Sequence, residues 1–390
     1  MIKDQTQSLF PQVCSWRRQL HRNPERSGAE VNTVAFIADL LDGQDLEIRR
    51  INGGYGLVAV VRGVSGPTIA LRADIDAIPV QEKAEVDFAS TVDGLSHTCG
   101  HDVHTAVMLG AARYFAKRRK SLVGNIVFIF QPEEETNLGA QKMLEAGCLK
   151  DPVVDCILGF HVLPEYRVGS VAISSGPLMA GESNFDITIR GIGCHGSTPY
   201  NGADAIAAAA TLVTNLYTAL NRRLNAMDPV ALTVGEISGG RAPNVVADSA
   251  VLRGTARSIS NQSDRLIERI LKETAASAAT AFGVEINVEY RREVPPLVNH
   301  ADVAKLAKKI LAADLPDLEV VEARPIMASD DFAFYLQGVP GLFFFLGISS
   351  GKEAAYPLHH SLFKVDEMAL QHGLTAVIAL TEGILCELRR

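Results

Sequence analysis

The stretch "GNIVFIFQPEEE", residues 124–135, indicates the fold most directly. Its centre is an uninterrupted run of β-branched and aromatic residues, which is typical of a strand buried on both faces. Pro132 ends the run and three consecutive glutamates follow it. In α/β proteins, ligands bind at the carboxyl ends of such strands, so this stretch predicts an α/β sheet with polar groups gathered at one edge.

The neighbouring segments alternate between the two kinds of periodicity. Short apolar runs bounded by Gly or Pro predict further strands at 56–63, 67–76 and 154–162. Helical spacing of apolar residues predicts helices in two parts over 10–42, at 104–118 and at 138–147. Strands that alternate with helices favour a parallel sheet covered by helices.

The pattern changes in the middle of the chain. "ESNFDITIRGIG" (182–193) alternates with period two, as a half-exposed strand does. The segments that follow predict, in order, a helix (203–225), strands at 230–238 and 250–258, a helix (262–281) and a strand (284–291). This order matches a ferredoxin-like α+β sandwich. We therefore expect residues 182–294 to form a domain inserted into one made of residues 1–181 and 295–390.

Composition excludes several classes of protein. The 390 residues carry a net charge of -8, which argues against nucleic-acid or anionic-membrane partners. Six cysteines are scattered without the spacing of a disulfide framework, and no signal peptide is evident. No apolar run approaches the ~18 residues of a membrane span. We expect a cytoplasmic protein with reduced thiols.

Groups that can bind a metal follow several of the predicted strands. They are Asp74, Asp76, Cys99, His101, Glu133–Glu135, His161 and the "PLHHS" stretch at 357–361. Thiolate, imidazole and carboxylate together form the ligand set of zinc, manganese, cobalt or nickel. Burying so many titrating groups without a cation would be very costly. An alternative is a cysteine hydrolase with Cys99 as nucleophile and His101 or His104 as base.

Six motifs, in this order, carry a resemblance to a known family. They are "LRADIDAIPV" (71–80), "HTCGHDVHTA" (97–106), "FQPEEE" (130–135), "GFHV" (159–162), "ASDDFAFYL" (328–336) and "LHHSLFKVDE" (358–367). Together they resemble the di-metal aminoacylase and carboxypeptidase family, in the branch of hippurate hydrolases, N-acetyl-diaminopimelate deacetylases and auxin–amino acid conjugate hydrolases. The resemblance implies a di-metal exopeptidase-like catalytic domain with an inserted lid domain through which the chain forms a homodimer.

The resemblance also implies two divalent metal ions (Zn, Mn, Co or Ni). The residues that match the family's ligands are Cys99, His101, Glu135, His161 and His359. Cys99 stands where related branches have a bridging aspartate, so it is expected to bridge the two ions as a thiolate. Glu134 matches the general base, and Asp76 is expected to orient a ligand histidine.

Three residues of the predicted lid match substrate-binding positions of the family. His195 is expected to donate to the scissile carbonyl oxygen, commonly from the dimer partner. Asn244 and Arg257 are expected to hold the substrate carboxylate, which the planar guanidinium can bind in two places.

The expected activity is metal-dependent hydrolysis of an N-acyl amino acid, with water activated by Glu134. Two alternatives accompany it: a dipeptidase or metallocarboxypeptidase that uses the same site on short peptides, and a non-catalytic binding protein. The presence of Glu134 argues against a non-catalytic protein. The expected partner is a small-molecule substrate, with no nucleic acid and no membrane.

Overall fold

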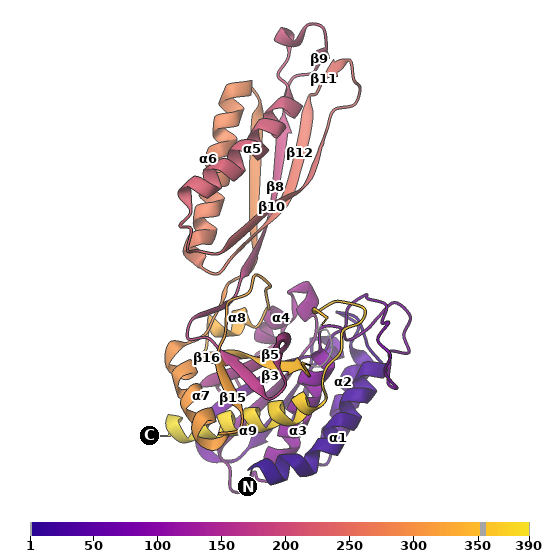
Figure 1. The fold of residues 1–390 in the computed structure, drawn as a ribbon, viewed down its shortest axis with the longest axis vertical. Helices are drawn as coiled ribbons and strands as arrows, with labels where there is room; N and C mark the ends of the chain where they lie inside the picture. Colours follow the sequence, from indigo (N-terminus) through magenta and orange to yellow (C-terminus); the bar gives the residue numbers. More distant parts are fainter. Residues whose placement is uncertain (1, 352–355, 390) are drawn as a thin grey trace. The chain divides into compact units, whose positions relative to one another are not determined.

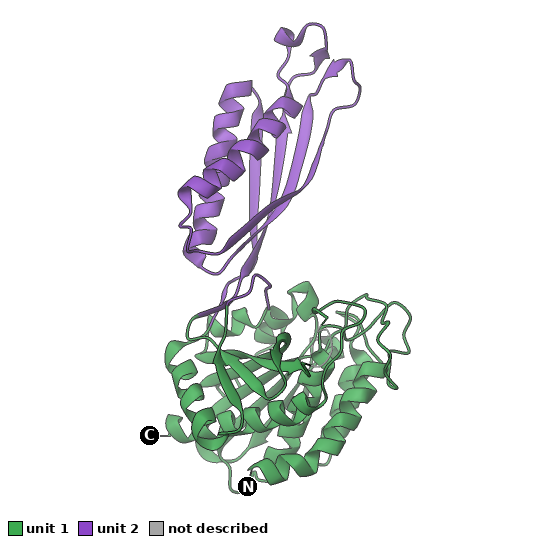
Figure 2. Cartoon of the chain, viewed as in Figure 1, with its two compact units in different colours: residues 1–176, 299–324, 331–390 green, residues 177–298, 325–330 purple. Residues whose placement is uncertain are grey.

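The computed structural model describes residues 2–351 and 356–389 and divides the chain into two compact units (Figure 1). Figure 2 colours them separately. Unit 1 consists of Met1–Gly176, Asn299–Arg324 and Asp331–Arg390. Unit 2 consists of Pro177–Val298 and the short segment Pro325–Asp330.

Unit 1 is built on an eight-stranded mixed sheet with the order β1-β2-β4-β3-β5-β16-β6-β15. Its four central strands, β4 (Val123–Gln131), β3 (Val64–Asp74), β5 (Cys156–Arg167) and β16 (Gly341–Ser349), run parallel. The outer strands are β1 (Glu47–Ile51), β2 (Gly56–Arg62), β6 (Ser170–Ile173) and β15 (Glu319–Glu322). Because the central strands are parallel, their carboxyl ends meet at one edge of the sheet.

Helices of unit 1 flank this sheet: α1 (Ile2–Arg22), α2 (Val31–Leu41), α3 (His101–Ala116), α4 (Gly139–Glu145), α7 (Ala301–Asp314), α8 (Ala333–Leu336) and α9 (Met368–Leu388). α3 is buried along nearly its whole length. α9 is long and apolar enough to cross a membrane by length and composition, but 72% of its most apolar window is buried inside the protein. It packs against α1, α3 and α7, as a core helix does.

Unit 2 contains an antiparallel four-stranded sheet with the order β10-β12-β8-β13. The chain runs β8 (Gly181–Arg190), α5 (Ala205–Arg223), β10 (Val230–Gly239), β12 (Ser249–Ser258), α6 (Asn261–Phe282) and β13 (Glu285–Val294). This order and connectivity confirm the predicted ferredoxin-like sandwich. The unit also contains four short strands: β7 (Pro177–Met179), β9 (Cys194–His195), β11 (Val245–Val246) and β14 (Leu297–Val298).

α5 and α6 lie on the same face of the unit 2 sheet (Figure 1). Phe185, Ile187 and Ile189 of β8 are fully buried and form part of the core with both helices. The alternate residues of β8, such as Glu182 and Asp186, project from the opposite side, because successive side chains of a strand point to opposite faces. We call this second side the open face.

Candidate metal centre

The five predicted ligands lie together in unit 1. Cys99 stands in the turn before α3 and His101 is the first residue of α3. His161 lies in β5, and Glu135 in the 3₁₀ turn η2 (Glu134–Thr136) that follows β4. His359 comes from the loop before α9 and joins the cluster through its Nε2 atom.

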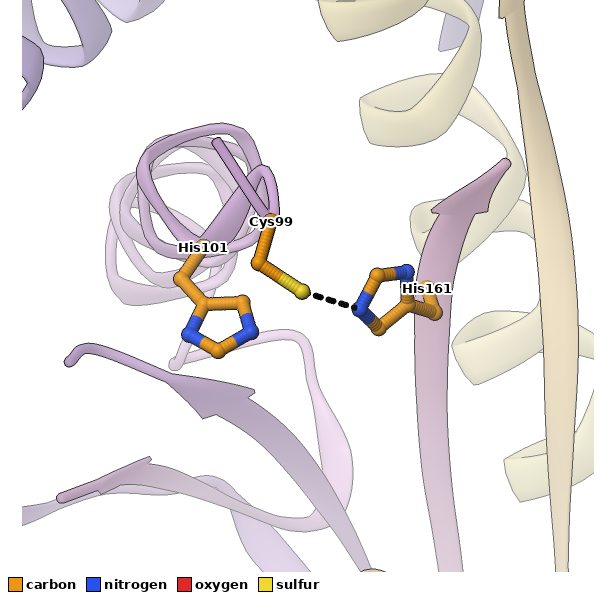
Figure 3. Close-up of side chains that lie close together, drawn as sticks. All are labelled: Cys99, His101 and His161. Carbon is orange, nitrogen blue, oxygen red and sulfur yellow. Dashed lines mark hydrogen bonds between the residues drawn. The ribbon is translucent and has the colours of Figure 1, made fainter. Parts of the chain in front are cut away.

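The distances within the cluster suit ligands that share cations. Cys99 Sγ lies 3.4 Å from Nε2 of His161 and 3.3 Å from Nε2 of His359. Nε2 of His359 is also 3.3 Å from Oε1 of Glu135. Zn ligands lie about 2.0–2.3 Å from the ion, so two ligands of one ion are roughly 3–4 Å apart. Figure 3 shows Cys99 and His101, at the start of α3, facing His161 of β5.

The tautomers of the two buried histidines suit metal binding. Nδ1 of His161 donates to the carbonyl oxygen of Val162 at 2.7 Å, and Nδ1 of His101 donates to the carbonyl oxygen of Asp76 at 2.9 Å. In both rings Nε2 therefore faces the cluster. Nε2 of His101 and Oε1 of Glu135 are buried without a hydrogen-bond partner. Such orphaned polar atoms, arranged with a thiol, fit a site for divalent cations.

The electrostatics of the cluster favour cations as well. Burial raises the pKa of the Cys99 thiol well above its usual value, and the neighbouring Glu135 and Glu134 carboxylates raise it further. Burial alone would lower the pKa of His101, yet the negative charges of Asp74 and Asp76 raise it to about 10. A divalent cation would offset this excess of negative charge and would hold the thiol ionised.

Backbone conformation brings the ligands into place. Gly100, between Cys99 and His101, has a φ of 90°, and a Cβ there would lie 2.3 Å from Cγ2 of Val162. Glycine thus lets the turn approach β5. Glu133 (φ 57°) and Asn137 (φ 60°), at the two ends of η2, adopt left-handed conformations. Non-glycine residues in this region cluster at functional sites, where the surrounding structure holds the strain.

Asp76 connects two of the predicted ligands. Its Oδ1 lies 3.2 Å from Nδ1 of His101, and its Oδ2 accepts the backbone N–H of Glu135 at 3.0 Å. The hydroxyl of Ser27 donates to the same Oδ2 at 2.7 Å. One fully buried carboxylate thus contacts the side chain of one predicted ligand and the backbone of another.

His104, a candidate base only in the cysteine-hydrolase alternative, makes two buried contacts. Its Nδ1 lies 2.6 Å from Oδ1 of Asp74, and its Nε2 accepts the N–H of Val162 at 3.0 Å. The Val162 bond requires a lone pair on Nε2, so the proton is on Nδ1 and points at Asp74. Since Nε2 is occupied, His104 cannot offer it to a metal, although Asp74, His101 and His104 lie close together.

The predicted lid histidine lies in unit 2 and is exposed. Nδ1 of His195 accepts the backbone N–H of Ser197 at 3.2 Å and lies 2.7 Å from the Ser197 hydroxyl. A lone pair on Nδ1 leaves the proton on Nε2, which is therefore a donor. The β9–β11 pairing and the hydrogen bond from Gly196 N to Asn244 O (2.7 Å) hold Asn244 beside this histidine.

Asn244 and Arg257 lie at opposite ends of the unit 2 sheet. Arg257 is the residue before the last of β12, whereas Asn244 directly precedes β11. Figure 1 shows β11 beyond the end of the sheet at which β12 begins. At about 3.3 Å per residue, β12 alone separates them by roughly 25 Å. Within one chain they therefore cannot contact the same carboxylate.

The chain was compared with known proteins. Residues 70–381 match peptidase family M20/M25/M40. The chain is 38% identical over 364 residues to an N-acetyl-L-cysteine deacetylase of Bacillus subtilis, which spans 93% of this chain and 86% of the relative. It is 34% identical to an N-acetyldiaminopimelate deacetylase of Priestia megaterium, over 93% of this chain and 95% of the relative.

A solved structure agrees with these relatives. The Bacillus subtilis YxeP protein, described as a dinuclear metal-binding peptidase from the M20 family, has a TM-score of 0.86 and 32% identity. The match covers 97% of this chain and 99% of that protein. The family match, the relatives and this structure together show that the chain belongs to peptidase family M20/M25/M40.

Proposed function

We propose that the chain is a metal-dependent amidohydrolase that cleaves the amide bond of N-acyl amino acids, releasing a carboxylate and the free amino acid. The observation that carries the proposal is the convergence of Cys99, His101, Glu135, His161 and His359, with Nε2 of His101 buried and without a hydrogen-bond partner. The deacetylase relatives support the substrate class.

Two divalent cations, held by these five residues, would supply the Lewis-acid chemistry that lowers the pKa of water and polarises the amide carbonyl. Glu134 is the proposed general base. Its Oε2 lies 3.8 Å from Nε2 of His101, so the carboxylate is directed at the cluster. It would take a proton from the attacking water and deliver it to the leaving amine nitrogen.

Glu135 is the proposed ligand of the two adjacent glutamates. Its Oε1 lies within 3.9 Å of His101 Nε2 as well as beside His359, so one carboxylate reaches two parts of the cluster. Cys99 lies between His161 and His359 and is the proposed bridging thiolate. The ligand set suits zinc, manganese, cobalt or nickel.

Unit 2 is the proposed lid. The Nε2–H group of its His195 is the proposed donor to the scissile carbonyl oxygen. The separation of Asn244 from Arg257 supports a homodimer, because two chains could supply the two groups to one substrate. We further propose that the enzyme works in the cytoplasm on small molecules, without nucleic-acid or membrane partners.

The test combines chelation with a substrate screen. The protein is dialysed against EDTA, reloaded with Zn, Mn, Co or Ni, and assayed on N-acetyl, N-benzoyl and indole-acetyl amino acids and on dipeptides. We expect activity on N-acyl amino acids that disappears on chelation and returns with metal. Activity confined to dipeptides would instead favour the peptidase alternative, which a relative named thermostable carboxypeptidase 2 supports.

The role of Glu134 is tested in the same assay. Glu134→Gln should keep the metal content and lower kcat by about 10²–10⁴-fold, the range for loss of a general base. Glu165→Gln, which changes an exposed glutamate of β5, is the matched control. A fully active Glu134→Gln enzyme would refute the proposed base.

A further inference from the structure

Arg257, a proposed carboxylate receptor, is already paired with a carboxylate of its own chain. It lies directly opposite Glu182 in the β12–β8 register, and its Nη2 donates to Oε2 of Glu182 at 2.9 Å. Nη1 of Arg257 contacts the hydroxyl of Ser329 (3.2 Å), which in turn donates to the same Oε2 at 3.1 Å. All three side chains belong to unit 2.

The pair is accessible enough for a ligand to compete with it. The side chains of Arg257 and Glu182 are 31% and 17% exposed. Both project from the open face of the sheet, on the side away from α5 and α6. An anion that approaches the guanidinium of Arg257 therefore also comes close to the negatively charged carboxylate of Glu182.

We propose that Glu182 is a specificity-determining residue, which competes with the substrate carboxylate for Arg257 and so weakens the preference for a free carboxylate. The inference rests on the proposed function. The inference predicts the substrate class. The KM values for N-acyl amino acids and for the corresponding uncharged carboxamides should differ less than they would if Arg257 had no carboxylate partner. The physical basis is that an arginine with a bound carboxylate has little net charge to offer a second one.

Arg257 also has a competing structural role. Its Nη1 donates to the carbonyl oxygen of Met327 at 3.3 Å, so it holds the segment Pro325–Asp330 against β12. A purely structural pair would affect stability and all substrates alike, whereas a competing carboxylate affects only substrates that carry a negative charge. The two roles therefore predict different kinetics.

The experiment compares N-acetyl-L-alanine with its carboxamide in the wild type and in Glu182→Gln. Glutamine keeps an oxygen that can accept from Arg257 and Ser329 but removes the charge. For a partly exposed pair we expect KM for the carboxylate to fall roughly three- to fivefold. KM for the carboxamide and kcat for both substrates should change by less than about twofold, as expected if only uniform binding of the carboxylate changes.

Two control variants separate charge at Arg257 from other effects. Asp186→Asn removes an acid that faces Arg253 in the same β12–β8 register on the same face. Ser329→Ala removes the shared hydroxyl and leaves the charges. Neither should change the ratio of the two KM values.

The outcomes are distinct. If Glu182→Gln leaves the ratio unchanged, shifts both substrates equally, or behaves like Asp186→Asn, the inference is overturned while the proposed function stands. If the metal-loaded wild type hydrolyses neither these compounds nor any other N-acyl amino acid, the proposed function fails and the inference with it.

Discussion

Nδ1 of His104 lies 2.6 Å from Oδ1 of Asp74, at the carboxyl end of β3, and both side chains are completely buried. On the other side of the ring, Nε2 accepts the N–H of Val162, the residue after the proposed ligand His161. The imidazole thus links the carboxyl end of β3 to the middle of the parallel strand β5, and we infer that it positions His161 without binding the metal.

His104→Ala should therefore weaken metal binding while leaving the five proposed ligands present. Loss of groups that orient ligands typically costs about 10–100-fold in metal affinity. The measurement is metal content by mass spectrometry at equilibrium with a buffered chelator, with wild-type protein alongside. His372→Ala, in α9 and outside the cluster, is the control. Equal metal affinity in His104→Ala and the wild type would contradict the positioning role.

The role of Cys99 can be separated from that of a nucleophile by substitution with aspartate. An aspartate offers a carboxylate ligand but no thiolate. We expect Cys99→Asp to retain metal and metal-dependent turnover within about 10²-fold of the wild type, because carboxylates also coordinate these ions. Cys99→Ala should lose metal.

Abolished turnover in a fully metal-loaded Cys99→Asp protein, together with chelator-resistant activity in the wild type, would favour the cysteine-hydrolase alternative. Cys386→Ser changes an exposed thiol and serves as the control for general effects of thiol loss.

Much of the fold follows from local sequence patterns. The apolar run at 124–131 and the period-two alternation at 182–190 predict β4 and β8, because burial on both faces or one face determines which residues are apolar. The first helix begins earlier than predicted, at Ile2, because its buried face extends to Thr6 and includes Leu9. Because Thr6 is polar although it is buried, the helical spacing of apolar residues cannot be recognised in the first turns.

The contacts around the site depend on information that no single segment contains. The pairing of Glu182 with Arg257 follows from the register of β8 on β12, and the separation of Asn244 from Arg257 follows from the length of β12. His104 accepts a hydrogen bond from the backbone N–H of Val162, and a backbone contact cannot be predicted from the identity of the side chain at that position. The motifs predict which residues are candidate ligands, but they do not predict the Glu182–Arg257 pair or the His104–Val162 hydrogen bond.

Gly100 offers a test of how tightly the ligand turn is held against β5. Gly100→Ala introduces a Cβ 2.3 Å from Cγ2 of Val162 at a φ of 90°, so both sterics and backbone conformation oppose it. Gly94→Ala is the matched control, because Gly94 has a φ of 71° but nothing within 4 Å of its added Cβ. The difference between the variants isolates the clash with β5.

We expect Gly94→Ala to cost about 1 kcal/mol of unfolding free energy, as for a left-handed alanine, with unchanged metal affinity. Gly100→Ala should cost more and should lower metal affinity, because Cys99 and His101 flank the displaced residue. Denaturant titration and the chelator competition measure the two effects. Equal metal affinities in the two alanine variants would mean that the turn tolerates displacement.

Glu30, at the start of α2, predicts a pH dependence of stability. Burial raises the pKa of its carboxyl group to about 7, and the negative charge of Asp76 adds to the effect. A carboxyl group with a folded-state pKa above its unfolded-state value of about 4.5 favours the folded state in its protonated form. Its contribution to stability therefore decreases as pH rises from about 4.5 to about 7 and stays low above that range.

Glu30→Gln should remove this dependence, since an amide keeps an oxygen that can accept the Glu133 N–H and carries no charge. Relative to the wild type, the variant should gain up to roughly 3 kcal/mol of unfolding free energy at pH 8 compared with pH 5. Urea titrations of metal-saturated protein at both pH values measure the difference. Glu285→Gln, at an exposed position in β13, controls for loss of one surface charge. A Glu30→Gln advantage that is the same at pH 5 and pH 8 would show that Glu30 is ionised in the folded protein at both.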